Sequence, residues 1–225
     1  AILMVVIPCK YSDKSPIVQC VASIRKHYPD DLIAVVDSDS DDKSYFESLE
    51  KYGVVIEDIQ NNNFLEGALW HCFEKYPDEE FIYLIQDSMK IKMNFDYVED
   101  ADFTCIASFP NTCWAENFEG GSAAQINFSK NALEKTNYEY LGPEVDWHPV
   151  FGISFFISRS LLQTLKDNGM DKYLPTSKME MEASERIWGM VLYQEGIDVK
   201  SACIMDTPIH TRPNPIISKI WLYRQ

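Results

Sequence analysis

The stretch Phe81-Ile82-Tyr83-Leu84-Ile85-Gln86-Asp87-Ser88 is an apolar run that breaks abruptly at polar residues. A continuous apolar run of this kind predicts a β-strand buried on both faces, as in a parallel sheet. A carboxylate at the end of a buried strand costs free energy unless it has a partner, and ligands of open α/β sheets bind where the strands end. Asp87 is therefore the first candidate for the floor of an active site. The alternative is a strand that simply ends at a hydrogen-bonded Asp in a turn.

Strands and helices alternate along the chain before this run. The apolar runs that predict strands are residues 2–7, 32–36 and 54–56. Between them, helical spacing predicts a helix from Ser15-Pro16 to the stop at Tyr28-Pro29, a second over residues 45–52 and a third over residues 64–76. The resulting β-α-β-α-β-α-β order implies a mostly parallel sheet with helices on both faces.

The chain after residue 100 is less regular. Its predicted strands are residues 103–109, 150–157 and 199–205, and its predicted helices are residues 123–136, 158–165 and 181–194. No repeat, low-complexity segment or linker divides the sequence, so we expect one α/β domain.

The composition argues against some functions. The 225-residue chain carries a formal net charge of −15, which suits neither general nucleic-acid binding nor an anionic membrane surface, because both depend on Lys and Arg. No apolar run approaches the ~20 residues of a membrane span, and the N-terminus lacks the charged flank of a signal peptide. The six cysteines show no C-x-x-C or zinc-ligand spacing. We therefore expect reduced thiols in a cytoplasmic protein.

Polar residues at the ends of other strands are candidates for the same site. Lys10 and Lys14 follow the first strand, where a Lys could meet a diphosphate, and no Gly-rich phosphate loop is present. The alternative for each lysine is a solvated loop residue. Asp37 follows the second strand, where a carboxylate can accept hydrogen bonds from ribose hydroxyls or a base N–H.

Two further candidates lie late in the chain. Glu182 and Glu185 are three residues apart, on one face of a predicted helix, where a carboxylate could act as a general base. The alternative is a charged helix start with an internal Glu–Arg pair. His210 follows the last predicted strand and could bind a metal, but a single His is more often a surface residue.

The order of these features resembles that of nucleotide-sugar glycosyltransferases with the GT-A fold, most closely the family-2-like group. Val5-Val6-Ile7-Pro8-Cys9 resembles the opening strand of that family. Residues 35–42 (VVDSDSDD) resemble its V-V-D-D-G-S-T-D nucleoside-binding segment, with Ser38 in place of the second Asp. Gln86-Asp87-Ser88 falls where the family places its acidic, metal-binding D-x-D motif, although only Asp87 is acidic. The segment from Ser184-Glu185 to Gly196 has the spacing of the helix that carries the catalytic base.

The resemblance implies a GT-A-like fold in a single domain, with a nucleotide-sugar-binding half (residues 1–100) and an acceptor-binding half with a C-terminal tail (residues 101–225). It implies transfer of a sugar from a nucleotide sugar, most simply a UDP-sugar, to a hydroxyl of a glycan or another acceptor. Glu185 would be the catalytic base of an inverting reaction, and Asp87 with His210 would hold Mn²⁺ or Mg²⁺ on the diphosphate. The implied donor-binding residues are Pro8, Lys10, Tyr11, Asp37, Asp39, Gly67, Asp87 and Arg212. Stacking on the acceptor is expected of Trp114, Trp147 and Trp188, for each of which core packing is the alternative.

Two other interpretations remain open. One is a sugar-nucleotide nucleotidyltransferase, because Ile7-Pro8-Cys9-Lys10 faintly resembles the opening of that class. The absence of any Gly before Gly53 argues against it, since the class needs a Gly- and Arg-rich loop. The other is a GT-A-like domain that binds a nucleotide sugar or a glycan without catalysis, which Gln86 and Ser88 in place of acids would support.

Overall fold

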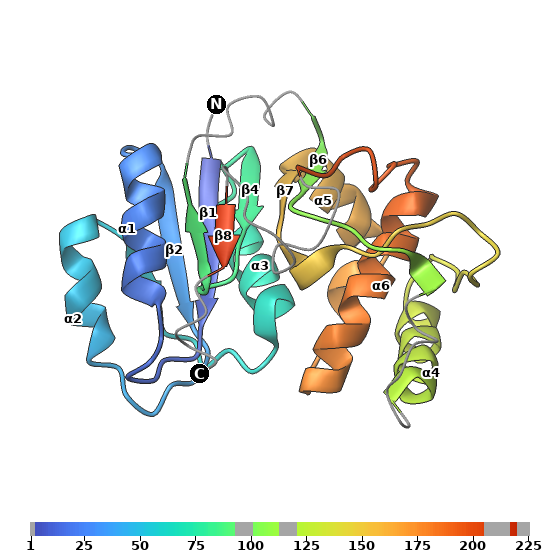
Figure 1. The fold of residues 1–225 in the computed structure, drawn as a ribbon, viewed down its shortest axis with the longest axis horizontal. Coiled ribbons are helices and arrows are strands. Elements are labelled where there is room, and N and C mark those ends of the chain that lie inside the picture. The colour runs from blue at the N-terminus through green and yellow to red at the C-terminus, as the bar shows by residue number, and fades with distance from the viewer. Residues whose placement is uncertain (1–2, 93–100, 113–120, 205–216, 220–225) are drawn as a thin grey trace.

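A six-stranded mixed sheet forms the centre of the molecule (Figure 1). The structure is a computed structural model, which describes residues 3–92, 101–112, 121–204 and 217–219. The strand order in the sheet is β3-β2-β1-β4-β7-β6. These strands are β1 (Leu3–Cys9), β2 (Leu32–Asp37), β3 (Val55–Glu57), β4 (Phe81–Leu84), β6 (Phe103–Cys105) and β7 (Phe155–Ser158).

The four strands from the first part of the chain are parallel. In the register, Val5 of β1 lies between Ile33 of β2 and Tyr83 of β4, and β3 pairs in parallel with β2. β7 runs antiparallel to both β4 and β6. The carboxyl ends of β1, β2, β3 and β4 therefore meet at one edge of the sheet.

Six α-helices and three short 3₁₀ turns connect the strands in the described residues. The helices are α1 (Ile17–His27), α2 (Tyr45–Leu49), α3 (Phe64–Lys75), α4 (Gly121–Glu134), α5 (Arg159–Asp167) and α6 (Lys178–Gln194). The 3₁₀ turns are Glu50–Tyr52, Phe151–Ile153 and Met170–Lys172. A separate antiparallel pair is formed by β5 (Met89–Ile91) and β8 (Ile217–Lys219).

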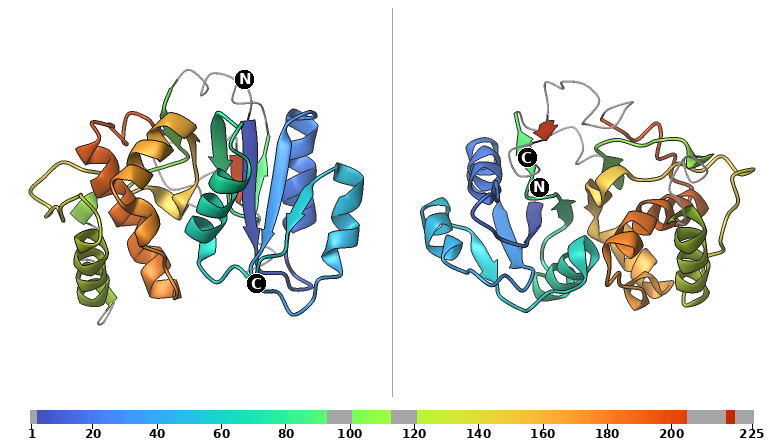
Figure 2. Two further views of the ribbon diagram at one scale, coloured as in Figure 1. Left: turned by 180° about the vertical axis from the view of Figure 1, so that it is seen from behind. Right: turned by 60° about the horizontal axis from the view of Figure 1, so that its bottom comes forward.

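Both faces of the sheet are covered, as expected for buried parallel strands. Residues alternate along β1, so that Met4 and Val6 face a hydrophobic cluster shared with α3, α5 and α6. Val5 and Ile7 face a second cluster shared with α1 and α2. Helix α1 lies over the sheet in the view of Figure 1, and α3 lies over it when the molecule is seen from behind in Figure 2. The prediction of a mostly parallel sheet covered by helices on both faces is confirmed.

Three predicted strands differ from the structure. The strand expected over residues 103–109 ends at Cys105. Residues 150–157 were expected to be extended throughout, but Gly152 adopts a φ of +64° within a 3₁₀ turn, so the strand begins only at Phe155. Residues 199–205 were expected to form a final strand. Instead, Asp198 accepts hydrogen bonds from the backbone N–H and the hydroxyl of Ser201 and from the backbone N–H of Ala202, and these bonds fold residues 198–202 into a turn.

The prediction that all cysteines are reduced is wrong for one pair. Cys105 and Cys203 form a disulfide across 98 residues of chain, which no spacing in the sequence indicates. Cys9, Cys20 and Cys72 are buried and are not part of a disulfide, as expected for cysteines that pack as small apolar residues. Among the described residues, none of the helices has the length and apolar character required to cross a membrane.

Candidate functional site

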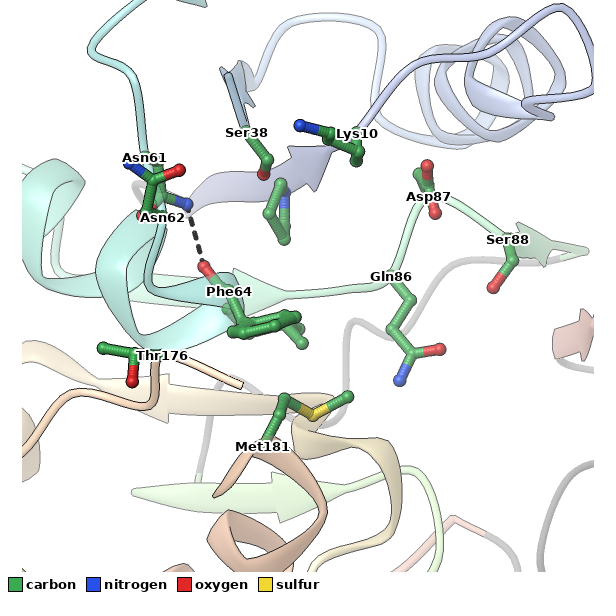
Figure 3. Close-up of a pocket in the computed structure, with 12 residues that line it drawn as sticks. Lys10, Ser38, Asn61, Asn62, Phe64, Gln86, Asp87, Ser88, Thr176 and Met181 are labelled. Atoms are coloured by element: carbon green, nitrogen blue, oxygen red, sulfur yellow. Dashed lines mark hydrogen bonds between the residues drawn. The ribbon is translucent and has the colours of Figure 1, made fainter. Parts of the chain in front are cut away.

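A cleft of about 690 Å³ opens at the carboxyl edge of the sheet (Figure 3). The segments that follow β1, β2 and β4 supply one side of it, and residues at the N-terminal ends of α3 and α6 supply the other. Its lining residues are Pro8, Lys10, Ser38, Asn61, Asn62, Phe64, Leu65, Gln86, Asp87, Ser88, Thr176 and Met181. Ligands of open α/β sheets bind outside the carboxyl ends of the strands, so this cleft is the candidate site.

The loop after β1 is tied to the loop after β2. Lys10 lines the cleft, and its ammonium group donates a hydrogen bond of 2.7 Å to the backbone carbonyl of Asp39. The backbone N–H of Tyr11 donates to Ser40 Oγ at 2.8 Å. The Tyr11 ring stacks on Tyr45, with 4.5 Å between the ring centroids. Lys10 is thereby held at the rim of the cleft as a fixed positive charge.

Asp37 lies beneath this loop and does not line the cleft. Its side chain is 0% exposed. One carboxylate oxygen accepts from the Tyr45 hydroxyl at 2.6 Å, and the other accepts from the backbone N–H of Ser40 at 2.9 Å. Asp37 thus stabilises the turn in which Asp39 adopts a φ of +55°. Direct contact between Asp37 and a nucleoside stays a prediction.

Asp87 lines the cleft at the end of the β4 segment, where the sequence placed it. Its Oδ2 accepts from the hydroxyl of Ser15 at 3.5 Å. The N-cap of α1 is Pro16, and no side-chain cap bond is formed at the start of that helix. Ser88, also in the lining, is buried. The acidic loop, Gln86-Asp87-Ser88, therefore offers one carboxylate to the cleft, whose lining also includes Lys10 (Figure 3).

The segment before α3 forms the wall next to Ser38. The buried Asn61 donates from Nδ2 to the Phe64 carbonyl at 2.9 Å, and its Oδ1 accepts from the Asn63 N–H at 3.1 Å. Gly67, one turn into the helix, makes room for this side chain, because a Cβ at Gly67 would lie 2.1 Å from Asn61 Oδ1. Gly67, predicted to bind the donor, is thus next to the lining but not part of it.

Strained backbone positions cluster around the cleft. Four non-glycine residues in the described chain have positive φ, namely Asp39, Gln60, Phe64 and Ile153. Phe64 lines the cleft itself, and Asp39 and Gln60 are next to the lining residues Ser38 and Asn61. Ile153 follows Gly152, which is outside the lining but accepts a hydrogen bond from the lining residue Gln86. Such conformations cost on the order of 1–3 kcal/mol each and are concentrated at functional sites.

Glu185 lies behind the cleft wall on α6, one turn after the lining residue Met181. Its Oε2 accepts a 2.7 Å hydrogen bond from the backbone N–H of Gly152. The Gly152 carbonyl accepts in turn from Nε2 of Gln86, which lines the cleft, at 2.8 Å. Burial raises the pKa of Glu185 to about 7, outweighing the Gly152 hydrogen bond and the nearby Arg186. A carboxyl group with a pKa near 7 suits proton transfer at neutral pH.

A second carboxyl group, which the sequence did not single out, lies deeper. Glu66 of α3 is 0% exposed, and burial raises its pKa to about 7. Its Oε1 accepts from the Tyr173 hydroxyl at 3.3 Å. Charge on Glu66 disfavours ionisation of Glu185 and contributes to the raised pKa of that carboxyl group.

Two of the three predicted acceptor-stacking tryptophans pack in the core instead. Trp188 is 0% exposed and lies 5.0 Å from the Phe155 ring. Trp147 is 1% exposed, and its Nε1 donates to the Gly142 carbonyl. Neither ring presents a face to the cleft, so the alternative of core packing holds for both. Trp114, His210 and Arg212 lie outside the described residues.

Several lining residues were not among those predicted from the sequence. Asn61 and Asn62 stand on the loop after β3, and Thr176 and Met181 stand where α6 begins. The run Asn61-Asn62-Asn63 held a usable signal, because it follows a parallel strand and so had to lie at the same edge as Asp37 and Asp87. Nothing comparable marks Thr176 or Met181.

The comparisons with known proteins bear on the fold. No protein-family model and no curated protein matches the sequence. Among solved structures, GalNAc-T7 with UDP, GalNAc and Mn²⁺ is similar, with a TM-score of 0.51 and 14% identity over 83% of this chain and 40% of that one. TarS 1–349 of S. aureus, in complex with UDP, gives a TM-score of 0.49 and 15% identity over 84% of this chain and 55% of that one. The chain thus spans about half of the length of these structures or less. The GT-A-like fold expected from the sequence is confirmed.

Proposed function

We propose that the protein is a glycosyltransferase that moves a sugar from a nucleoside-diphosphate sugar, most simply a UDP-sugar, to a hydroxyl group of a glycan or another acceptor. The observation that carries the proposal is the cleft at the carboxyl edge of β1, β2 and β4, with Lys10 and Asp87 in its lining and the Glu185 carboxyl group behind it. The similar fold of GalNAc-T7, crystallised with UDP, GalNAc and Mn²⁺, supports the same assignment.

The lining divides into regions that suit different parts of such a donor. Ser38, Asn61 and Asn62 offer hydroxyl and amide groups for a nucleoside. Lys10 and the Asp87 loop lie where a diphosphate would lie, with Lys10 as the balancing cation. Phe64 and Met181 form an apolar part of the lining, and an apolar surface suits the less polar face of a sugar ring.

A divalent metal fits the acidic loop in part. Asp87 places one carboxylate in the cleft, and carboxylate oxygen is a ligand that Mn²⁺ and Mg²⁺ prefer. Within the described residues there is no group of three or more His, Cys, Asp or Glu that could hold an ion alone. Further ligands would be the diphosphate oxygens and, as the resemblance implies, His210. When bound to a diphosphate, such an ion supplies neutralisation of charge on the leaving group.

Glu185 is the proposed general base. One of its oxygens is occupied by the Gly152 N–H, and the other accepts no hydrogen bond from a described residue. That second oxygen takes the proton of the acceptor hydroxyl. The acceptor oxygen forms a bond to the anomeric carbon, the bond from that carbon to the diphosphate oxygen breaks, and the nucleoside diphosphate leaves. Attack from the side opposite the leaving group inverts the anomeric configuration.

The test measures release of nucleoside diphosphate from a panel of nucleotide sugars, with and without Mn²⁺. We expect one donor to turn over, with a rate that rises with pH through about 7 as Glu185 ionises. Glu185→Gln should lose roughly 10²-fold or more in rate and still bind nucleoside diphosphate. The matched control is Glu134→Gln on the exposed surface of α4, which should not change the rate. Full turnover by Glu185→Gln would remove Glu185 from the mechanism.

A binding domain without catalysis is the second candidate. The observation that favours it is the acidic loop, in which Asp87 is the only acid among the lining residues. Tight binding of nucleotide sugars, with no turnover of any donor in the presence of Mn²⁺, would select this function over the first.

A further inference from the structure

Gln86 stands directly before Asp87, where an acidic metal motif would carry a second acid, yet the two side chains diverge. Figure 3 shows the Gln86 side chain extending towards Met181, whereas Asp87 points away from it. The Nε2 atom of Gln86 donates a hydrogen bond of 2.8 Å to the carbonyl oxygen of Gly152. Gln86 therefore contacts the turn before β7, on the α6 side of the cleft.

Gly152 links two side chains through its own backbone. Its carbonyl accepts from Gln86, and its N–H donates to Glu185 Oε2 at 2.7 Å. The φ of +64° at Gly152 is one that L-residues rarely adopt. A Cβ at this position would lie 2.7 Å from Gln86 Nε2. Glycine thus permits both the turn and the close approach of the amide.

The contact requires a hydrogen-bond donor at residue 86. A backbone carbonyl is an acceptor, so its partner must donate. The Gln86 amide has two N–H donors, whereas an ionised carboxylate has none. An acid at this position would face the Gly152 carbonyl oxygen without a proton to share. Gln86 in place of an acid is therefore explained by the contact that it makes.

We propose that Gln86 is a positioning residue, which holds Glu185 through Gly152 and so connects the Asp87 loop to the base. The inference rests on the proposed function, because it assigns Glu185 that role. It makes residue 86 part of the base's support and leaves Asp87 as the acid of the loop. A nucleotide sugar that contacts Asp87 is then one residue away from Gln86, which supports Glu185, the residue that receives the proton of the acceptor hydroxyl.

Other charged groups also face Glu185 and affect its pKa in the original protein. Glu182 and Arg186 lie on the same helix, and Glu66 approaches from α3. Arg186 favours the ionised form of Glu185, and both glutamates disfavour it. A new carboxylate at residue 86 would act in the same direction as Glu66 and Glu182.

The experiment compares Gln86→Met, which keeps the length of the side chain and removes the donor, with Gln86→Glu, which also adds charge. Three quantities are measured for each: nucleoside-diphosphate affinity, kcat against pH, and the titration of the Glu185 carboxyl group by carbon NMR. The matched control is Gln19→Glu, the same chemical change at an exposed position on α1.

We expect Gln86→Met to lower kcat about tenfold, the loss that corresponds to one hydrogen bond, with unchanged nucleoside-diphosphate affinity. Gln86→Glu should move the midpoint of the kcat profile and the NMR titration of Glu185 to higher pH together. Gln19→Glu should move neither. A melting temperature close to that of the original protein shows that each variant folds.

Two results would overturn the inference. One is a Gln86→Met variant with the original kcat profile and Glu185 titration. The other is a Gln86→Glu variant with tighter Mn²⁺ binding and an unshifted titration, which would make residue 86 a metal ligand. If the original protein turns over no donor, the proposed function fails, while the NMR titration still reports whether Gln86 acts on Glu185.

Discussion

The raised pKa of Glu185 makes a prediction about stability that does not depend on any substrate. Burial shifts this pKa from the ordinary 4.5 to about 7, so the folded chain binds the proton more tightly than the unfolded chain does. Between pH 4.5 and 7 the folded state therefore holds more protons, and the free energy of unfolding falls as pH rises. Above pH 7 Glu185 is ionised in both states, and the full loss of unfolding free energy remains. Glu185→Gln has no ionisable group here and removes this dependence.

The size of the effect follows from the same two values. One pKa unit corresponds to about 1.4 kcal/mol, which gives a ceiling of roughly 3 kcal/mol at pH 8. At pH 5 the carboxyl group is mostly ionised in the unfolded chain and still protonated in the folded chain, and the loss of unfolding free energy is below about 1 kcal/mol. A glutamine oxygen can still accept from the Gly152 N–H, so the hydrogen bond is kept. The free energy of unfolding of the variant, relative to that of the original protein, should therefore rise by roughly 2 kcal/mol between pH 5 and pH 8.

Urea unfolding at pH 5 and pH 8 measures the difference. Glu134→Gln, exposed on α4, serves as the control and should run parallel to the original protein. Glu66 is present in both proteins, and its own pKa of about 7 lowers both stabilities as pH rises. Because the Glu66 charge is one cause of the raised pKa of Glu185, the difference reports Glu185 together with its coupling to Glu66. An identical difference at the two pH values, or a variant that is less stable at pH 8, would refute the argument. A destabilising Glu185, in its proposed role as base, would be an expected trade of stability for activity.

Two further predictions concern the residues beneath the cleft. Gly67→Ala gains about 1 kcal/mol in helix propensity, but its Cβ would lie 2.1 Å from Asn61 Oδ1 and must displace that side chain. Nucleoside-diphosphate affinity measured by calorimetry should therefore fall. Unchanged affinity would exclude Asn61 from the nucleotide site. Asp37→Asn leaves one carbonyl oxygen for two donors, the Tyr45 hydroxyl and the Ser40 N–H. It should lower the free energy of unfolding, measured with urea, by about 2 kcal/mol. The loss should be less than additive with that of Tyr45→Phe, and full additivity would contradict a shared hydrogen bond.

The parallel half of the sheet could be predicted from sequence because its signals are local. The runs that became β1, β2 and β4 are continuous and apolar, and helices with apolar spacing separate them. The later elements depend on tertiary contacts. β7 is paired with β4, which lies more than 70 residues earlier, and the extended signal of residues 150–157 is interrupted by the positive φ of Gly152. Composition alone could not show that Trp188 is enclosed by the core.

The acidic loop shows how far a motif can be taken without coordinates. The position of Asp87 followed from the strand that precedes it, and the cleft lies there. From the sequence, Gln86 was a missing acid that weakened a metal site. In the structure it is a donor aimed at a carbonyl, and that carbonyl belongs to the residue whose N–H holds Glu185. Gln86 donates a hydrogen bond to the Gly152 carbonyl, 66 residues later in the chain, so the residue type at this position depends on the turn at Gly152. A search that requires an acid at the position of Gln86 would therefore miss any chain in which this residue supports the proposed base and only the next residue can bind a metal.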